Sequence, residues 1–173
     1  MKEDISIMLG DTKFNFRVAC FFEYKDKMLL HRNVKVDNFW NLVGGRVKCG
    51  ETTKEALIRE LEEELGYKFE PERLQLFQIN EMFFVYDNIN SHELNFMYHI
   101  KLTDDDELAH KQDFGSCDKA HIVYHWFDKT EVANKKIKCL PITIYNLAKC
   151  DKFDTIRWSM ERKVNEWFLH SQL

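Results

Sequence analysis

Flexible and chain-breaking residues are scarce in this sequence. Its 173 residues include only two prolines and six glycines, and no segment has the Pro-, Gly- or Ser-rich composition of a linker. No apolar run reaches the length of a membrane span, and the N-terminus lacks the long apolar segment of a signal peptide. We therefore expect one domain over residues 1–173, in the cytoplasm and without a membrane partner.

Paired cysteines and basic clusters are scarce as well. None of the five cysteines belongs to a C-x-x-C pair, so a zinc site or a disulfide framework is not expected. The net charge is −4, and the one lysine cluster, Lys135, Lys136 and Lys138, is interpreted as a solvated loop. Proteins that bind long nucleic acids usually carry a basic patch, so we do not expect such a partner. The oligomeric state stays open, a homodimer included.

Hydrophobic residues are abundant enough to form a core. The sequence is 45% hydrophobic and 14% aromatic, which suffices for a domain of this length. Runs of β-forming residues predict strands at 14–24, 27–32, 39–45, 74–86, 93–102 and 121–127, with a polar turn at 87–92. One helix is predicted near Pro141. Another is predicted over 155–170, where apolar residues recur at helical spacing: Ile156, Met160, Val164, Trp167 and Phe168. This mixed order predicts an α/β sandwich.

The segment GGRVKCGETTKEALIRELEEELGY, Gly44 to Tyr67, predicts a helix with well-defined ends. Thr52 and Glu55 have the spacing of a capping box, so the helix should begin near Thr53. Gly66 is a suitable C-terminal stop.

This helix should have two distinct faces, because successive residues are turned by about 100°. One arc is apolar and should pack on the core: Leu57, Ile58, Leu61 and Leu65. A neighbouring arc carries Glu60, Glu63 and Glu64 beside Ala56, whereas Glu62 falls on the outer side. Carboxylates next to a core are costly unless a cation neutralises them. Since Mg²⁺ and Mn²⁺ prefer oxygen ligands, these three glutamates are interpreted as a site for such an ion.

Two glycines precede the helix, at the end of a predicted strand. Gly44 and Gly45 allow the backbone to approach closely, and a carbonyl oxygen there can complete an oxygen-only metal shell. Arg59 neighbours the acidic arc and can orient one of its carboxylates.

Together these residues resemble the Nudix box. The matching positions are Gly45, Glu51, Arg59, Glu60, Leu61, Glu63, Glu64, Gly66 and Tyr67. Only Tyr67 departs from the pattern, because an aliphatic residue is usual at that packing position. The order of predicted strands and helices also resembles the α/β/α sandwich with a mixed β-sheet of the Nudix hydrolases.

The resemblance implies a metal-dependent hydrolase that cuts a diphosphate linkage in a nucleoside diphosphate derivative. By this resemblance Glu60, Glu63, Glu64 and Arg59 are the catalytic residues. The same three glutamates bind Mg²⁺ or Mn²⁺ with the carbonyl of Gly44 or Gly45, and Glu51 supports the loop. The general base is either Glu60 or a carboxylate from a later segment, for which the candidates are Glu81, Glu93, Asp113 and Asp118.

The substrate is less well defined by the sequence. Phe39 and Trp40 are expected to contact a base, as are Phe83, Phe84 and Tyr86, and His31 and Arg32 are placed to meet phosphates. The proline marker of ADP-ribose hydrolases is missing, as are the NADH and coenzyme A motifs. A nucleoside triphosphate cut to a monophosphate therefore ranks first, and an ADP-ribose or nucleotide-sugar pyrophosphatase is the alternative.

Two non-hydrolytic readings remain. A nucleotide-sensing regulator would usually lack box glutamates, and none is missing here. An isoprenoid diphosphate isomerase would need a catalytic cysteine motif, which surrounds none of the five cysteines.

Overall fold

The computed structural model describes residues 3–162. The strands are β1 (Ser6–Leu9), β2 (Thr12–Tyr24), β3 (Lys27–Asn33), β4 (Val43–Arg46), β5 (Gln75–Tyr86), β6 (Ile89–Lys101), β7 (Phe114–Gly115), β8 (Ile122–Asp128) and β9 (Arg157–Arg162). The helices are α1 (Thr53–Leu65), α2 (Lys129–Ala133) and α3 (Thr143–Leu147), with 3₁₀ turns η1 (Pro71–Arg73) and η2 (Glu107–His110). No helix within this range is long and apolar enough to cross a membrane.

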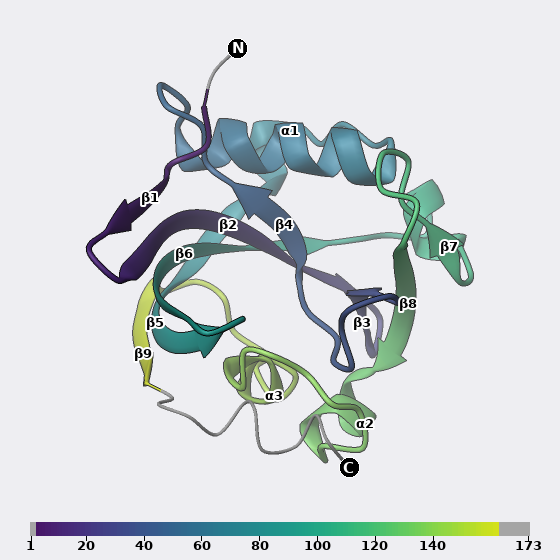
Figure 1. Cartoon of the computed structure of the whole chain (residues 1–173). Helices are drawn as coiled ribbons and strands as arrows, with labels where there is room; N and C mark the ends of the chain where they lie inside the picture. Colours follow the sequence, from purple (N-terminus) through teal and green to yellow (C-terminus); the bar gives the residue numbers. More distant parts are fainter. Residues whose placement is uncertain (1–2, 163–173) are drawn as a thin grey trace.

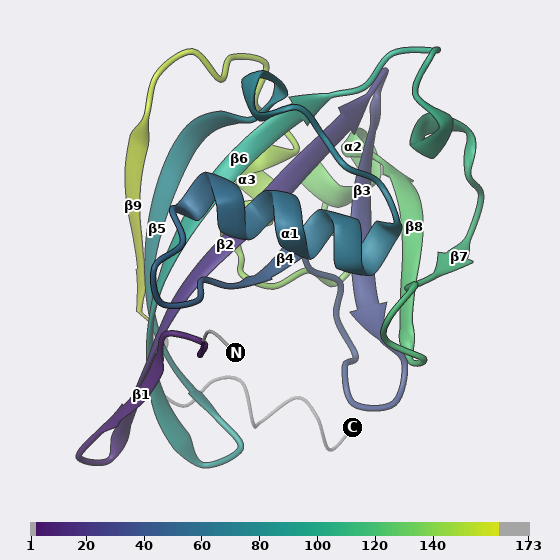
Figure 2. The same ribbon diagram turned by 90° about the horizontal axis from the view of Figure 1, so that it is seen from above.

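All nine strands join one mixed sheet. The main path runs β7-β8-β3-β2-β6-β5-β9, and β1 and β4 both pair with β2. Figure 1 shows α1 on one face of this sheet and α2 and α3 on the other. Seen from above, α1 lies across the middle of the sheet, over β2 and β4 (Figure 2). The predicted α/β/α sandwich with a mixed sheet is therefore confirmed.

The long parallel pair of β2 and β6 separates two hydrophobic cores. The first lies between the sheet and α1, where Val18 and Phe22 of β2 pack with Leu57 and Leu61 of the helix. The second lies on the opposite face and includes Phe21 and Met97 of the sheet with residues of α3. Side chains alternate between the two faces along a strand, so the odd-numbered residues of β6, like Met97, lie on this second face.

Most predicted strands are found, with two corrections to their bounds. The strand predicted at 39–45 begins only at Val43, because Trp40 and Asn41 make isolated bridges instead of a continuous ladder. The polar turn predicted at 87–92 is shorter, and β6 already begins at Ile89. Asp87 and Asn88 both have positive φ, 50° and 59°, which is the geometry of a two-residue hairpin turn.

The predicted helix over 155–170 is wrong where the structure describes it. Residues 157–162 form β9, which pairs in parallel with β5. An edge strand offers unpaired backbone groups, and Ser159 adds a side-chain hydrogen bond to Asn80 (2.8 Å). Ile156 and Met160, expected in the core, are 61% and 63% exposed. The other members of the apolar stripe, Val164, Trp167 and Phe168, lie outside the described residues.

Candidate active site

The ends of α1 are fixed by local hydrogen bonds. The Glu55 amide donates to the Thr52 hydroxyl (3.2 Å) and the Thr52 amide donates to the Glu55 carboxylate (2.8 Å), so the predicted capping box is confirmed. Gly66 ends the helix with φ of 75°. The predicted faces are found as well: Leu57, Leu61 and Leu65 are buried, Ile58 is half-buried and Glu62 is exposed.

The two glycines of β4 allow a close approach between strand and helix. A Cβ on Gly45 would collide with the carboxyl group of Glu60. A Cβ on Gly44 would lie 2.8 Å from the Cα of Ala19 in β2. The Glu60 carboxylate therefore lies directly against the backbone of β4.

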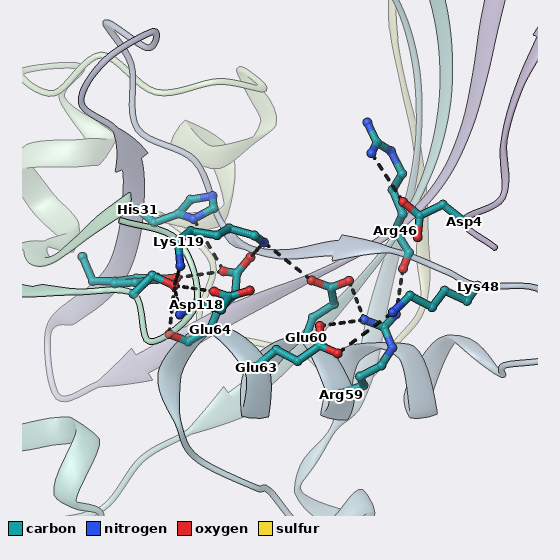
Figure 3. Close-up of polar contacts among 12 residues, drawn as sticks. Asp4, His31, Arg46, Lys48, Arg59, Glu60, Glu63, Glu64, Asp118 and Lys119 are labelled. Atoms are coloured by element: carbon teal, nitrogen blue, oxygen red, sulfur yellow. Dashed lines mark hydrogen bonds and ion pairs between the residues drawn. The ribbon is translucent and has the colours of Figure 1, made fainter. Parts of the chain in front are cut away.

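Arg59 ties this carboxylate to the preceding loop (Figure 3). Its Nε donates to Glu51 (2.9 Å) and its Nη2 to the Arg46 carbonyl (3.0 Å). Its Nη1 donates to Glu60 (2.7 Å) and to Glu63 (3.1 Å). The hydrogen bond from Arg59 also holds the pKa of the Glu51 carboxyl below its usual value. One guanidinium thus fixes the loop and two of the helix glutamates together.

Glu64 is almost completely buried, with 1% exposure, and is surrounded by hydrogen-bond donors. Tyr124 donates to its Oε2 (2.8 Å), and His31 Nδ1 lies 3.9 Å from the same atom. The Lys119 ammonium contacts the other oxygen and lies 4.0 Å from Glu60 Oε2. Burial raises the pKa of the Glu64 carboxyl, and Lys119 opposes this shift. Figure 3 shows Lys119 reaching between the two carboxylates, so its ammonium offsets part of their charge.

The third glutamate of the predicted set stands apart from this pair. The Glu63 side chain is 43% exposed and is held by Arg59 and, at 4.0 Å, by Lys48. Within residues 3–162, no three His, Cys, Asp or Glu side chains converge closely enough to hold a metal ion as they stand. A divalent ion could use Glu60 and Glu64 only if Lys119 leaves the space between them.

A cavity of about 510 Å³ is lined by His31 and Arg46 among other residues. His31 Nδ1 lies 3.9 Å from Glu64, and Arg46 follows Gly45 in the chain. The lining of the cavity is mixed, with apolar and aromatic residues such as Phe39, Phe83, Phe84, Tyr86 and Leu140 and polar residues such as Asn15, Ser91, Glu93 and Asn95. Ligand sites commonly have volumes of about 300–1,000 Å³, so this cavity has the size of a small-molecule site.

The residues predicted to contact substrate are only partly brought to this cavity. Phe39 lines it. Trp40 instead packs edge-on against Phe127, with ring centroids 4.8 Å apart. The Arg32 guanidinium lies over the Trp40 ring at 4.8 Å, so these two side chains stack on each other.

The candidate general bases are also separated by the fold. Asp118 lies in the same loop as Lys119, close to Glu64 (Figure 3). Glu93 lines the cavity. Glu81 and Asp113 each contact a histidine that does not line it.

Lys119 and Tyr124 were not found from the sequence. They are 55 and 60 residues from Glu64 in the chain, in the loop before β8 and in β8 itself. A lysine in a polar loop and a tyrosine in a strand carry no signal by themselves, so only the pairing of β8 with β3 reveals them.

Comparison with known proteins identifies the family. The sequence matches the NUDIX domain over residues 13–145, and no curated protein matches it significantly. A MutT protein from Bacillus halodurans has a similar structure, with a TM-score of 0.64, 17% identity, and coverage of 87% of this chain and 91% of that chain. A Nudix hydrolase from Nitrosomonas europaea is also similar, with a TM-score of 0.58, 17% identity, and coverage of 86% of this chain and 79% of that chain. The structural likeness establishes a shared fold, and the domain match, which spans most of the chain, shows that this protein belongs to the Nudix family of hydrolases that act on nucleoside diphosphate derivatives.

Proposed function

We propose that this Nudix hydrolase is a divalent-metal-dependent pyrophosphohydrolase that cuts a nucleoside triphosphate and releases a nucleoside monophosphate. The observation that carries the proposal is the buried Glu60–Glu64 pair, which lies next to His31, a residue that lines a cavity of about 510 Å³. A substrate whose phosphates reach the pair can place its base and ribose in the cavity.

The residues of the Glu60–Glu64 pair fit Mg²⁺ or Mn²⁺. Glu60 and Glu64 supply carboxylate oxygens, and the backbone of Gly45 lies directly under Glu60. The Lys119 ammonium contacts Glu64 and lies 4.0 Å from Glu60, which supports a cation position between the two carboxylates. We propose that Glu60, Glu63 and Glu64 hold the ion with the carbonyl of Gly44 or Gly45, an all-oxygen donor set of the kind these ions prefer. When bound, such an ion offsets the charge of the diphosphate and makes a water molecule more acidic.

The protein's own side chains then fix the orientation of the carboxylates and accept the proton of the attacking water. Arg59 fixes the orientation of Glu60 through a 2.7 Å hydrogen bond, and Tyr124 fixes Glu64. The attacking water must lose a proton to a carboxylate within hydrogen-bond reach. Of the predicted candidates, Glu60 and Asp118 lie near Glu64 (Figure 3), and Glu93 lines the cavity.

The shape of the site supports the triphosphate over ADP-ribose. The cavity has aromatic walls from Phe39, Phe83 and Phe84, which suit one stacked base. ADP-ribose and nucleotide sugars carry a second bulky group beyond the diphosphate. For these substrates the second group would have to lie outside the cavity, near Glu63 and Lys48 at the exposed edge of α1.

The test is turnover of a substrate panel with Mg²⁺ or Mn²⁺. The panel contains the common nucleoside triphosphates, ADP-ribose and a nucleotide sugar, and hydrolysis in ¹⁸O-labelled water locates the cut by mass spectrometry. We expect release of nucleoside monophosphate and pyrophosphate from a triphosphate. Faster turnover of ADP-ribose than of every triphosphate would reject this substrate choice. Tight nucleotide binding without turnover would favour a regulator instead of an enzyme.

A further inference from the structure

Strand β9 is an edge of the sheet that carries large exposed apolar side chains. Among residues 3–162 it pairs only with β5 and stands at the end of the strand order. Figure 2 shows β9 at the border of the sheet, beyond the end of α1. Ile156, directly before the strand, and Trp158 and Met160 within it are 61%, 62% and 63% exposed. The free backbone groups of such an edge can pair with another chain, so β9 has the character of an interface.

The side chains of β9 form two rows on opposite faces of the sheet. Gln78 donates to Ser159 (2.8 Å) and to Thr143 of α3 (3.0 Å), so the odd-numbered side chains of β9 lie on the face of α3. Side chains alternate along a strand, and Trp158 and Met160 therefore lie on the face of α1. Charged residues thus occupy one face of this edge and apolar residues the other.

The order of residues in β9 is complementary to itself in an antiparallel pair. If two copies of the strand pair about Ser159, Trp158 of each copy lies opposite Met160 of the other. In the same register Arg157 lies opposite Glu161. Methionine sulfur makes favourable contacts with aromatic rings, and opposite charges across a ladder stabilise it. Because the relation is two-fold, each of these pairs occurs twice.

A neighbouring register lacks this complementarity. If the pair were centred on Met160, Trp158 would face Arg162 and Ser159 would face Glu161, so no ion pair would form. Within one chain Arg157 donates to the Lys152 carbonyl, and Glu161 accepts from the Ile142 amide (3.3 Å). A guanidinium has five donors and a carboxylate accepts several hydrogen bonds, so these contacts are compatible with an added ion pair.

We propose that this protein forms a two-fold symmetric homodimer in which the β9 strands of two copies pair antiparallel about Ser159. The two sheets join into one, and each copy covers Trp158 and Met160 of the other. The strand offers six residues, fewer than the roughly 20–30 per side of a standard interface, so the dissociation constant is on the order of 10–100 µM. The inference is independent of the proposed function, because this pairing needs neither the Glu60–Glu64 pair nor a nucleotide.

Sedimentation velocity of the full chain tests the dimer. We expect the wild type to change from monomer to dimer between about 1 and 300 µM, a range that brackets this dissociation constant. Met160→Lys adds a charge to the edge, which opposes pairing, and should weaken association at least about tenfold. Met8→Lys is the matched control on β1, where Met8 is 53% exposed, and should associate like the wild type. A wild type that stays monomeric at every concentration, or equal losses in both variants, overturns the proposal.

Cross-linking tests the register. In a pair centred on Ser159 the two Ser159 Cα atoms are about 4.5–5.5 Å apart, within the roughly 4.4–6.8 Å range of disulfides. Ser159→Cys should therefore give a disulfide-linked dimer on mild oxidation, and trypsin should release two linked copies of residues 158–162.

Two controls account for unspecific oxidation. The wild type reports the background of its own cysteines, and Glu72→Cys carries an added thiol at an exposed site in η1; neither should give the linked dimer. A wild-type dimer without the linked peptide in Ser159→Cys would mean that another surface pairs, and a monomer whose introduced thiol stays free would mean that residues 163–173 cover this edge within one chain. Either result rejects pairing through β9.

Discussion

Lys119 neutralises a carboxylate that the fold has buried, and its removal should have two opposite effects. In Lys119→Met the Glu64 carboxylate, 1% exposed, would keep its neighbour Glu60 but lose the ammonium between them. Two unit charges 4 Å apart interact by about 4 kcal/mol at an effective dielectric constant of 20. The Lys119 side chain is 46% exposed, so water screens part of this interaction. We therefore expect the metal-free protein to lose about 1–2 kcal/mol of unfolding free energy.

Affinity for a divalent ion should change in the other direction. In the wild type the ion must displace the Lys119 ammonium from Glu60 and Glu64, whereas in Lys119→Met no displacement is needed. If about 1.4 kcal/mol of this cost is removed, the dissociation constant for Mn²⁺ falls about tenfold. The first quantity is measured by urea unfolding in EDTA and the second by calorimetric titration with Mn²⁺.

A matched lysine makes the result specific. Lys136→Met changes an exposed lysine after α2 and should alter neither quantity. The reasoning would be refuted if Lys119→Met weakened Mn²⁺ binding, or if it left both the stability and the affinity of the wild type unchanged.

Three further outcomes follow from individual side chains. Glu64→Gln should lower turnover at least about 100-fold, because mutation of even outer-shell partners of a metal lowers affinity or activity by about 10–100-fold. Glu62→Gln, on the outer face of α1, should have the turnover of the wild type in steady-state assays. Equal losses of turnover in the two variants would show that the face assignment is wrong. The hydrogen bond from His99, aided by Lys129, lowers the pKa of the Glu23 carboxyl to about 2, so the wild type should lose stability as the pH falls from about 4.5 towards 2. Glu23→Gln should lack this acid-dependent loss in urea unfolding at pH 2–7, and parallel curves for the two proteins would contradict the assignment. Trp158→Ser should change the free energy of unfolding, measured with urea, by no more than about 0.5 kcal/mol, since Trp158 is 62% exposed on β9. A loss above about 2 kcal/mol would mean that the Trp158 side chain is buried.

The sequence alone was sufficient for α1 and its faces. The capping pair Thr52 and Glu55 is three residues apart, and the apolar and acidic arcs repeat within 13 helical residues. Such signals are local, because a helix satisfies its backbone within itself and its periodicity assigns each side chain to a face. This explains why the burial of Leu57 and Leu61 and the exposure of Glu62 could be predicted without any knowledge of the sheet.

The C-terminal segment shows where local periodicity fails. Ile156 and Met160 have helical spacing, but the edge of β5 provides backbone partners that a short segment can join as a strand. Tertiary contacts often override such a pattern, and an edge strand needs no continuous apolar face. The outcome depended on which strand of the sheet was left unpaired, which the segment itself does not encode.

The contents of the candidate active site were decided by tertiary structure. The sequence supplied Glu60, Glu64 and the two glycines, but the pairing of β3 with β8 brought Tyr124, and with it the Lys119 loop, to the buried Glu64. The parallel ladder of β2 and β6 likewise placed Glu93 in the cavity, 3.8 Å from Arg17, although the two are far apart in the chain. Strand register is set by the whole sheet and not by any one segment, so these charge partners emerge only when the sheet has formed.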